Sequence, residues 1–473
     1  MTGPITDPIT GLHELSIAEA GRRLRAGTVT SQALTRAALD RIVALDDRLY
    51  AFVLLTEARA MEDAARADAE RAAGTDRGPL HGIPYALKDI YDTAGIRTTC
   101  HSKLRIDVVP EHDSVVAAKL AQAGGVLLGK LATHEFAIGG PSFDLPFPPA
   151  RNPWNTDHIT GGSSSGSGTA VASGMTRLAM GSDTAGSIRG PAAWCGTVGI
   201  KPTYGRVSRR GVFPLSWTLD HCGPLTRSVE DAAIALQLIA GHDPADHASA
   251  DVPVPDYRAA LDHGVSGLRI GIPRAFFAEA ELRTAPVLAA IDRTAEQLRA
   301  AGAIVQDIVL PDYARFAVVT RVIMLSEAFA IHEKDLRERI GDYGAITIGR
   351  FALGAAITAA DYVQALRVRR TLTEAVDAAL QGCDALLTAT TLTTAPRFDA
   401  PGDSISSISP VQTSPFNATG HPAISVPVGL SAEELPLAVQ LVGRAFDEAG
   451  LLRVARAVEV LSGWQDVPLP ALG

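Results

Sequence analysis

Residues 161–190 read GGSSSGSGTAVASGMTRLAMGSDTAGSIRG and contain two clusters of glycine and serine, at 161–168 and 181–187. An Ala-rich segment of about helical length, 169–180, separates them. Glycine permits positive φ and close approach of the backbone. Successive N–H groups in such turns point the same way and form a nest for negative charge. Serines on a loop of this kind provide what acyl transfer needs, a nucleophile beside an oxyanion hole.

Other uses of a Gly/Ser segment do not match this sequence. A flexible linker would not enclose an apolar helix-like run or lead directly into the apolar segments 191–194 and 196–200. A Walker-type phosphate loop needs a lysine after its glycines, and none occurs between Lys130 and Lys201. The dinucleotide pattern G-x-G-x-x-G fails at Val171. The segment therefore matches neither of these two nucleotide-binding patterns.

The composition is that of a globular enzyme, with 473 residues, 47 % apolar and 20 % charged. The net charge of −9 and the absence of a basic cluster argue against a nucleic-acid partner. No apolar run is long enough to span a membrane, and the N-terminal sequence lacks the pattern of a signal peptide. Scattered cysteines without a C-x-x-C pair fit a reducing cytoplasm and no zinc site: Cys100, Cys195, Cys222 and Cys383.

Short apolar runs alternate with helical patterns, which indicates an α/β fold with a mostly buried sheet. No interdomain linker is evident, so we expect one domain, 1–473, with a catalytic core at 80–210. Helical segments are expected at 12–75, 114–123, 229–240, 286–301 and 448–461, and a helical excursion that borders the substrate pocket at 310–382. Strands are expected at 83–90, 125–128, 268–272, 385–387, 423–428 and 438–441.

Only six of the 43 basic residues are lysines, so each lysine is of interest. Lys88 lies in segment 83–91, which apart from Lys88 and Asp89 is apolar on both alternating faces, as in a strand covered on both sides. Burial lowers the pKa of a lysine and makes its amine available as a base near neutral pH. A structural salt bridge is the alternative, but Asp89 points to the opposite face and is a poor partner. No serine stands three residues before a lysine, so the fold must bring a Ser–Lys pair together.

Together these segments resemble the amidase signature family, from LHGIP at 80–84 to LPLAVQLVGR at 435–444. The most specific part is 161–206, which includes GSDTAGSIR and KPTYGR. The resemblance implies a single large mixed sheet of about eleven strands between helices, with no cofactor and no metal. It also implies a triad with Ser187 as nucleophile, Ser163 as a bridging serine held by a cis peptide, and Lys88 as base.

In the implied mechanism, neutral Lys88 takes a proton from Ser163, which takes one from Ser187 as that serine attacks an amide carbonyl. Ser164, Asp183 and Arg189 are expected to support the loops. The sequence departs from the family where glycine is usual, at Ala185 before the nucleophile and at Ser165 in the first cluster. The backbone N–H groups expected to form the oxyanion hole are those of Thr184, Ala185, Gly186 and Ser187.

Three other interpretations of the chain remain open. The segment 162–166 matches G-x-S-x-G, which would make Ser164 the nucleophile of an α/β-hydrolase, although the preceding 152–160 has the composition of a turn. A second alternative is the amidase-type subunit of a glutamine-dependent tRNA amidotransferase, which supplies ammonia to partner chains. Its Glu-Ala-Ser-Ser-Asn-type segment is not evident, and 326–332 is the comparable stretch. A catalytically idle binding protein is the third.

The substrate is predicted from apolar segments near the core motifs, at 136–147 and 318–329. An apolar lining favours small aryl or alkyl amides, with carbamates (urethanes), anilides and esters possible because all form a similar tetrahedral intermediate. We therefore expect an amidase in the cytoplasm with a small-molecule partner, no nucleic acid, no membrane and a possible homodimer. The predicted substrate-binding residues are Phe136, Ile138, Gly139, Gly140 and Phe143.

Overall fold

The computed structural model describes residues 11–278, 280, 282–400 and 411–471, and its strands form one sheet of eleven strands. In spatial order these are β1 (Phe52–Leu55), β3 (Val126–Leu131), β2 (Pro84–Lys88), β4 (Leu178–Asp183), β6 (His221–Thr226), β5 (Val198–Lys201), β10 (Ala423–Leu430), β11 (Pro436–Val442), β9 (Ala385–Ala389), β7 (Arg269–Ile272) and β8 (Ile304–Asp307). Strands β2, β3 and β4 are parallel to one another, as are β7, β8 and β9, while the remaining neighbours are antiparallel. The expected mixed α/β fold is confirmed.

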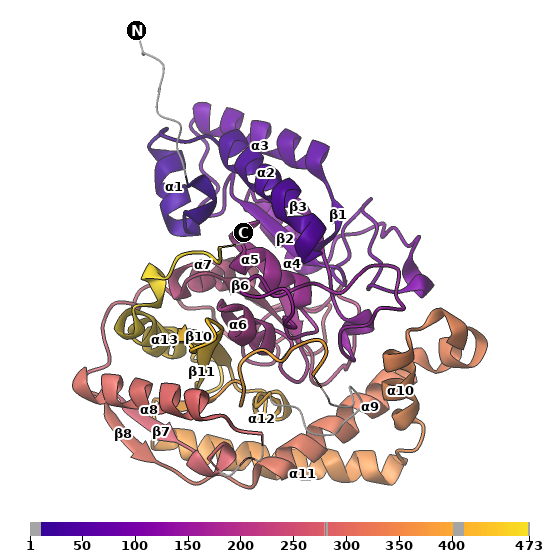
Figure 1. Cartoon of the computed structure of the whole chain (residues 1–473), viewed down its shortest axis with the longest axis vertical. Coiled ribbons are helices and arrows are strands. Elements are labelled where there is room, and N and C mark those ends of the chain that lie inside the picture. The colour runs from indigo at the N-terminus through magenta and orange to yellow at the C-terminus, as the bar shows by residue number, and fades with distance from the viewer. Residues whose placement is uncertain (1–10, 279, 281, 401–410, 472–473) are drawn as a thin grey trace.

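Helices cover both faces of this sheet (Figure 1), and the buried apolar side chains form two cores. Side chains alternate along β2, so Tyr85 and Leu87 join one core and Ala86 joins the other. The first core lies under α1 (Ile17–Arg25), α4 (Val115–Gln122), α7 (Val229–Ile239), α8 (Ala285–Ala300) and α13 (Glu448–Ser462). The second lies under α2 (Ser31–Leu49), α3 (Glu57–Ala72), α5 (Ser165–Ala172) and α6 (Arg189–Cys195).

The six predicted strands are confirmed to within a few residues, but five strands were not predicted: β4, β5 and β6 inside the sheet, and the edge strands β1 and β8. Both edge strands have four residues, and neither has a fully buried residue. A short edge strand carries no continuous apolar run and no clean alternation, so hydrophobic periodicity does not reveal it. The prediction that all of 12–75 is helical is accordingly wrong at β1.

The helix-like segment predicted at 169–180 is also wrong in its boundaries. Helix α5 begins inside the first Gly/Ser cluster at Ser165, and β4 begins at Leu178. Glycine lets this helix pack closely, because a Cβ on Gly166 would lie 2.4 Å from the carbonyl oxygen of Ala51. Buried small residues at 169–180 suit a core helix and a core strand equally well, so composition cannot separate the two.

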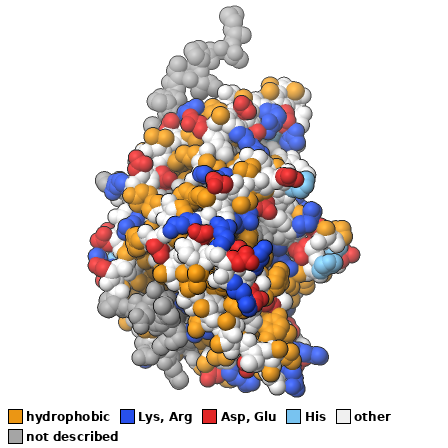
Figure 2. All heavy atoms as spheres, turned by 90° about the vertical axis from the view of Figure 1, so that its right-hand side faces the viewer, with side chains coloured by type: hydrophobic (Ala, Val, Ile, Leu, Met, Phe, Trp, Pro, Cys, Tyr) orange, Lys and Arg blue, Asp and Glu red, His pale blue; other side chains and the backbone are white. Residues whose placement is uncertain are grey.

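Helices α9 (Tyr313–Glu338), α10 (Ala345–Gly354) and α11 (Ala359–Gln381) occupy the segment expected to be a helical excursion. They lie at the lower edge in Figure 1, far from α1–α3 at the top, and the short α12 (Ser414–Ala418) packs against α9. Within the described residues no single helix is long and apolar enough to cross a membrane, although α10 and α11, bent by 88°, pass that test together. Acidic and basic side chains are interspersed over the face shown in Figure 2.

Candidate active site

Lys88 lies at the end of β2 and is fully buried. Its Nζ donates to the Oγ of Ser163 at 2.6 Å and to the Oγ of Ser182 at 2.8 Å. Burial lowers the pKa of this amine to about 7, while the charges of Asp220 and Asp183 act in the opposite direction. The lysine therefore exchanges a proton near neutral pH while it touches two hydroxyls.

The neighbouring Asp89 does not pair with Lys88. Its carboxylate lies 3.4 Å from Nζ of Lys130 and accepts from the N–H of Thr99 at 3.0 Å. Among the described residues, no carboxylate is within ion-pair distance of Lys88. The alternation of side chains along β2 thus leaves the Lys88 amine among neutral partners, which is the condition for a lowered pKa.

The first Gly/Ser cluster presents Ser163 to this amine. The peptide bond between Gly162 and Ser163 is cis, and the Ser163 carbonyl accepts from the N–H of His134 at 3.0 Å. Ser164 is buried, and its hydroxyl donates to the carbonyl of Ser182 and accepts from the Ser182 N–H, both at 3.3 Å. The hydroxyl of Ser164 therefore braces the two loops against each other. No strand precedes it within 152–160, so the hydrolase elbow is not formed.

The second cluster holds Ser187 in the turn after β4, where its side chain is partly accessible. The Gly186 N–H donates to Oδ1 of Asp183 at 2.7 Å, so this predicted oxyanion donor is occupied within the loop. Among the described residues, the N–H groups of Thr184, Ala185 and Ser187 donate to no protein acceptor. Ala185 does not have positive φ, so alanine fits this position without strain.

Asp183 and Arg189 form a buried brace behind this turn. Arg189 donates from Nε and Nη2 to the two carboxylate oxygens of Asp183, at 3.0 Å each. Although burial alone would raise it, the pKa of Asp183 is held below its ordinary range by Arg189. Arg189 also reaches Gln440 at 2.6 Å and Asn417 at 2.5 Å, so it ties the turn to β11 and α12.

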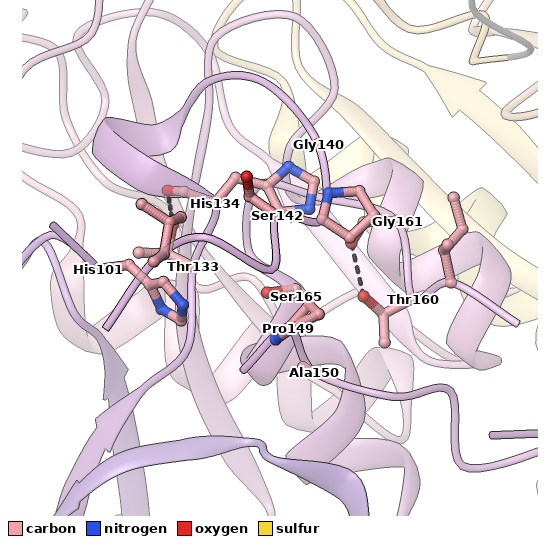
Figure 3. A pocket seen from close by; sticks show the side chains of 13 residues that line it. His101, Thr133, His134, Gly140, Ser142, Pro149, Ala150, Thr160, Gly161 and Ser165 are labelled. Atoms are coloured by element: carbon pink, nitrogen blue, oxygen red, sulfur yellow. Dashed lines mark hydrogen bonds between the residues drawn. The ribbon is translucent and has the colours of Figure 1, made fainter. Parts of the chain in front are cut away.

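A small cavity of about 10 Å³, room for about one water molecule, lies beside the first cluster (Figure 3). His134, Gly161 and Ser165 contribute to its wall. Burial, with the nearby charge of Lys88, lowers the pKa of His134 to about 3, so this imidazole is neutral. A Cβ on Gly162 would lie 1.9 Å from the His134 ring, and glycine is therefore required there.

The predicted substrate-binding residues do not form one pocket. Phe136 is buried in an aromatic cluster with Phe213 and His332, at ring-centroid distances of 5.1 and 4.5 Å. Phe143 is 68 % exposed on the surface, and Gly140 lines the small cavity. The remaining two, Ile138 and Gly139, line neither cavity.

A larger cavity of about 500 Å³ is lined by residues between 137 and 248, and we refer to it as the 204–248 cavity. It includes Ser182, the second hydrogen-bond partner of Lys88, and Ala137. The signal for Ser182 in the sequence was its place beside Asp183 in the second cluster. The other lining residues are Tyr204, Arg209, Arg210, Val212, Phe213, Pro214, Leu215, Trp217, Asp220, His221, Cys222, Ala245, Asp246, His247 and Ala248.

Segment 215–220 of this cavity is held by a buried carboxylate from α9. Glu327 accepts from the Ser216 hydroxyl, from the N–H and hydroxyl of Thr218 at 3.1 and 2.8 Å, and from the Tyr362 hydroxyl at 2.7 Å. Arg369 of α11 donates to the Thr218 carbonyl at 3.0 Å. Helices α9 and α11 thus fix one wall of the 204–248 cavity, a role that sequence reasoning did not assign to Glu327.

Comparison with known proteins shows likeness along the whole chain. A family model described as Amidase matches residues 33–452. A glutamyl-tRNA(Gln) amidotransferase subunit of Moorella thermoacetica is 42 % identical over 95 % of this chain and 96 % of its own length. The solved structure of the corresponding subunit from Thermotoga maritima has a TM-score of 0.84 at 33 % identity, covering 98 % of this chain and 99 % of that one. A peptide amidase from Stenotrophomonas maltophilia has a TM-score of 0.81 at 34 % identity, with coverage of 96 % and 97 %.

These likenesses correct two predictions. The prediction of a hydrolase for small aryl or alkyl amides is wrong, because relatives that match 95 % of the chain are named as subunits of a tRNA amidotransferase. The prediction of a small-molecule partner and no nucleic acid is wrong for the same reason, since a net charge averages over the chain and does not define an assembly. The apolar side chains used for the substrate prediction belong to the core or the surface, as Phe136 and Phe143 show.

Segment 326–332, which had favoured a simple amidase over the amidotransferase, lies inside α9. Glu327 and His332 are buried there and serve packing and the hold on segment 215–220. The absence of the Glu-Ala-Ser-Ser-Asn-type segment from this packed helix therefore does not exclude likeness to an amidotransferase subunit.

Proposed function

This chain belongs to the amidase family, and from that premise we propose that it is the amide-hydrolysing subunit of a glutamyl-tRNA(Gln) amidotransferase. The observation that carries the proposal is the 42 % identity to the Moorella thermoacetica protein, which extends over 95 % of this chain. In this role the chain would work in the cytoplasm with partner subunits and tRNA, and would release ammonia from the side-chain amide of glutamine.

The proposed relay uses the contacts around Lys88. Neutral Lys88 accepts a proton from Ser163, whose Oγ lies 2.6 Å from Nζ. Ser163 accepts the proton of Ser187, and the Ser187 Oγ attacks the amide carbon. The proton held by the relay then passes to the leaving nitrogen, which departs as ammonia. Water hydrolyses the acyl-enzyme and returns Ser187 to its starting state.

The proposed oxyanion hole consists of the N–H groups of Thr184, Ala185 and Ser187, which have no acceptor among the described residues. Gly186 serves instead to fix the turn through Asp183. Loss of one donor aimed at the oxyanion costs about 3–4 kcal/mol of barrier in comparable enzymes.

The turnover of urethanes and esters and the single-domain assignment stay predictions. Turnover of urethanes and esters, expected from the shared tetrahedral intermediate, has no support in the names of the relatives. The assignment of all 473 residues to one domain is likewise a proposal, supported by the single sheet and by a family match over 33–452.

Reconstitution tests the proposed function. The purified chain takes the place of its counterpart in an amidotransferase assembled from the Moorella thermoacetica partner subunits, with glutamyl-tRNA(Gln), glutamine and ATP, which activates the glutamyl carboxylate, as substrates. We expect glutaminyl-tRNA to form, and the S187A variant to support its formation only with added ammonia. Hydrolysis of other amides without any glutamine-dependent product would contradict the proposal.

A further inference from the structure

Three of the six lysines are fully buried, and they are Lys88, Lys130 and Lys201. Lys88 belongs to the proposed relay, and Lys201 donates to two backbone carbonyls, at 3.1 and 2.6 Å. Lys130 stands on β3, which pairs with β2, the strand that ends at Lys88. A buried ammonium group is costly unless charge and hydrogen bonds compensate it, so the partners of Lys130 indicate what it does there.

The partners of Lys130 lie in the chain just after Lys88. Its Nζ donates to the Tyr91 carbonyl at 2.7 Å and to the Thr98 hydroxyl at 2.6 Å. The same nitrogen lies 3.4 Å from the Asp89 carboxylate. The three hydrogens of the ammonium group thus have three acceptors, one of them charged. Lys130 therefore acts as a hydrogen-bond donor that fixes this segment, and not as a second base.

The segment that Lys130 holds is the turn that ends β2. The Lys88 carbonyl accepts from the N–H groups of Ile90, at 2.7 Å, and Tyr91, at 3.1 Å. The turn is therefore tight, and its backbone is bonded directly to that of Lys88. Since Lys130 binds both Asp89 and Tyr91 of this turn, it limits how far the Lys88 backbone can move.

Tyr91 extends this restraint to the second partner of the Lys88 amine. Its side chain is fully buried, and its hydroxyl donates to the Gly181 carbonyl at 2.6 Å. The next residue is Ser182, whose hydroxyl accepts from Lys88 Nζ at 2.8 Å. The contacts that begin at Lys130 thus join the end of β2, which carries the amine, to β4, which carries one of its partners.

We propose that Lys130 is a positioning residue that holds the Lys88 amine within proton-transfer distance of Ser163. Asp89 and Tyr91 are the groups through which it acts. The inference rests on the proposed function, because it takes Lys88 as the base of that relay. Proton transfer needs a separation of about 2.6–3.2 Å, and Lys88 Nζ lies 2.6 Å from the Ser163 hydroxyl. A misplacement of about 1 Å can lower a rate by about 10²-fold.

The rate at which phenylmethanesulfonyl fluoride modifies Ser187, followed by mass spectrometry, tests the inference whichever amide the enzyme cleaves. In this reaction the serine oxygen forms a bond to sulfur, fluoride leaves, and the hydroxyl proton passes to the relay. We expect K130M to lower the maximal rate at least about tenfold and to leave the half-saturating concentration within about threefold. K119M is the matched control, because the half-buried Lys119 also donates to two carbonyls, at 3.1 and 2.8 Å, and it should keep the wild-type rate.

Two further variants separate positioning from a structural role. K130M leaves the Asp89 carboxylate buried without its partner and should lower the midpoint of urea unfolding. Adding D89N removes that charge and should restore most of the lost stability, whereas the low rate should persist because the Tyr91 carbonyl still lacks its donor. Y91F removes one hydroxyl and should lower the rate at least about threefold. Y257F is its control, since the buried Tyr257 hydroxyl has no hydrogen-bond partner among the described residues.

Recovery of the rate together with stability in the double variant would overturn the inference, because Lys130 would then have a structural role only. A wild-type rate in Y91F, or an equal loss in K119M, would do the same. A wild-type protein that is not sulfonylated at Ser187 would contradict the base on which the inference rests.

The inference and the proposed function can fail separately. Sulfonylation that depends on Lys130, in a protein that supports no glutaminyl-tRNA formation, would uphold the inference and contradict the proposed function. Glutaminyl-tRNA formation by K130M at the wild-type rate would uphold the proposed function and contradict the inference.

Discussion

Arg189 spans both carboxylate oxygens of Asp183, at 3.0 Å each, and neither side chain is exposed. Replacing Arg189 with Met leaves a buried carboxylate without its partner, which typically costs about 3–5 kcal/mol. We therefore expect R189M to lower the free energy of unfolding in urea by that amount. The control is R337M, which breaks the exposed pair with Glu333 and should cost less than about 1 kcal/mol. Similar losses in the two variants would contradict a structural role for this brace.

Ser187 and Ser164 distinguish the proposed nucleophile from that of an α/β-hydrolase. S187A should reduce ammonia release from the amide substrate by at least about 10⁴-fold, as removal of a nucleophile does in serine hydrolases. S164A removes only the hydroxyl that braces Ser182, and kcat/KM should fall by less than about tenfold. Both variants should be measured by steady-state kinetics. Retained activity in S187A with loss in S164A would favour the other serine.

The lowered pKa of Lys88 predicts how activity depends on pH. Burial lowers its pKa to about 7, so below that pH the protonated amine cannot accept the proton of Ser163. We expect kcat/KM to rise with pH through about 7 and to level off above it. K88M should lose at least about 10³-fold at every pH, because a thioether supplies no base. A rate without inflection between pH 6 and 8 would contradict the role of Lys88 as base.

Gly186 and Ala185 test the geometry of the second cluster. Gly186 has φ of 134°, and a Cβ there would lie 1.9 Å from the Thr413 hydroxyl. G186A should displace the turn, so that a neighbouring N–H group of the oxyanion hole no longer points at the oxyanion. We expect kcat to fall by at least about 10²-fold, which is the cost of one lost oxyanion donor. A185G creates the double glycine that is usual before the nucleophile in the family, and it should leave kcat within about threefold. If kinetics show the two variants to be equally active, the turn does not need its observed shape.

Glu327 tests whether α9 positions the wall of the 204–248 cavity. E327Q replaces one acceptor oxygen with a donor and weakens the hold on Thr218 and Ser216, so we expect KM for the amide to rise about tenfold. The value of kcat should stay within about threefold, because Glu327 does not contact the triad. The exposed E333Q on the same helix is the control. A fall in kcat with unchanged KM would be inconsistent with a role in shaping the cavity.

Local sequence determined much of what the structure shows around the triad. Lys88 stands in a short run that is apolar on both alternating faces, as in a strand covered on both sides, so its burial was predicted from the pattern. The glycines of the two clusters occur where a Cβ would collide, as at Gly162 and Gly186. The contact of the Gly186 N–H with Asp183 joins residues three positions apart, so it lies within a single turn of the local sequence.

Only the tertiary structure decided which distant groups meet. Lys88 and Ser182 are 94 residues apart, and Glu327 lies 109 residues from Thr218, so no periodicity could join them. Tertiary structure also decided the role of the apolar segment around Phe136. An apolar side chain suits a pocket wall and a core equally well, and the sequence does not distinguish the two. Hydrophobicity reports that a residue avoids water, but packing alone determines whether it faces a ligand or another element.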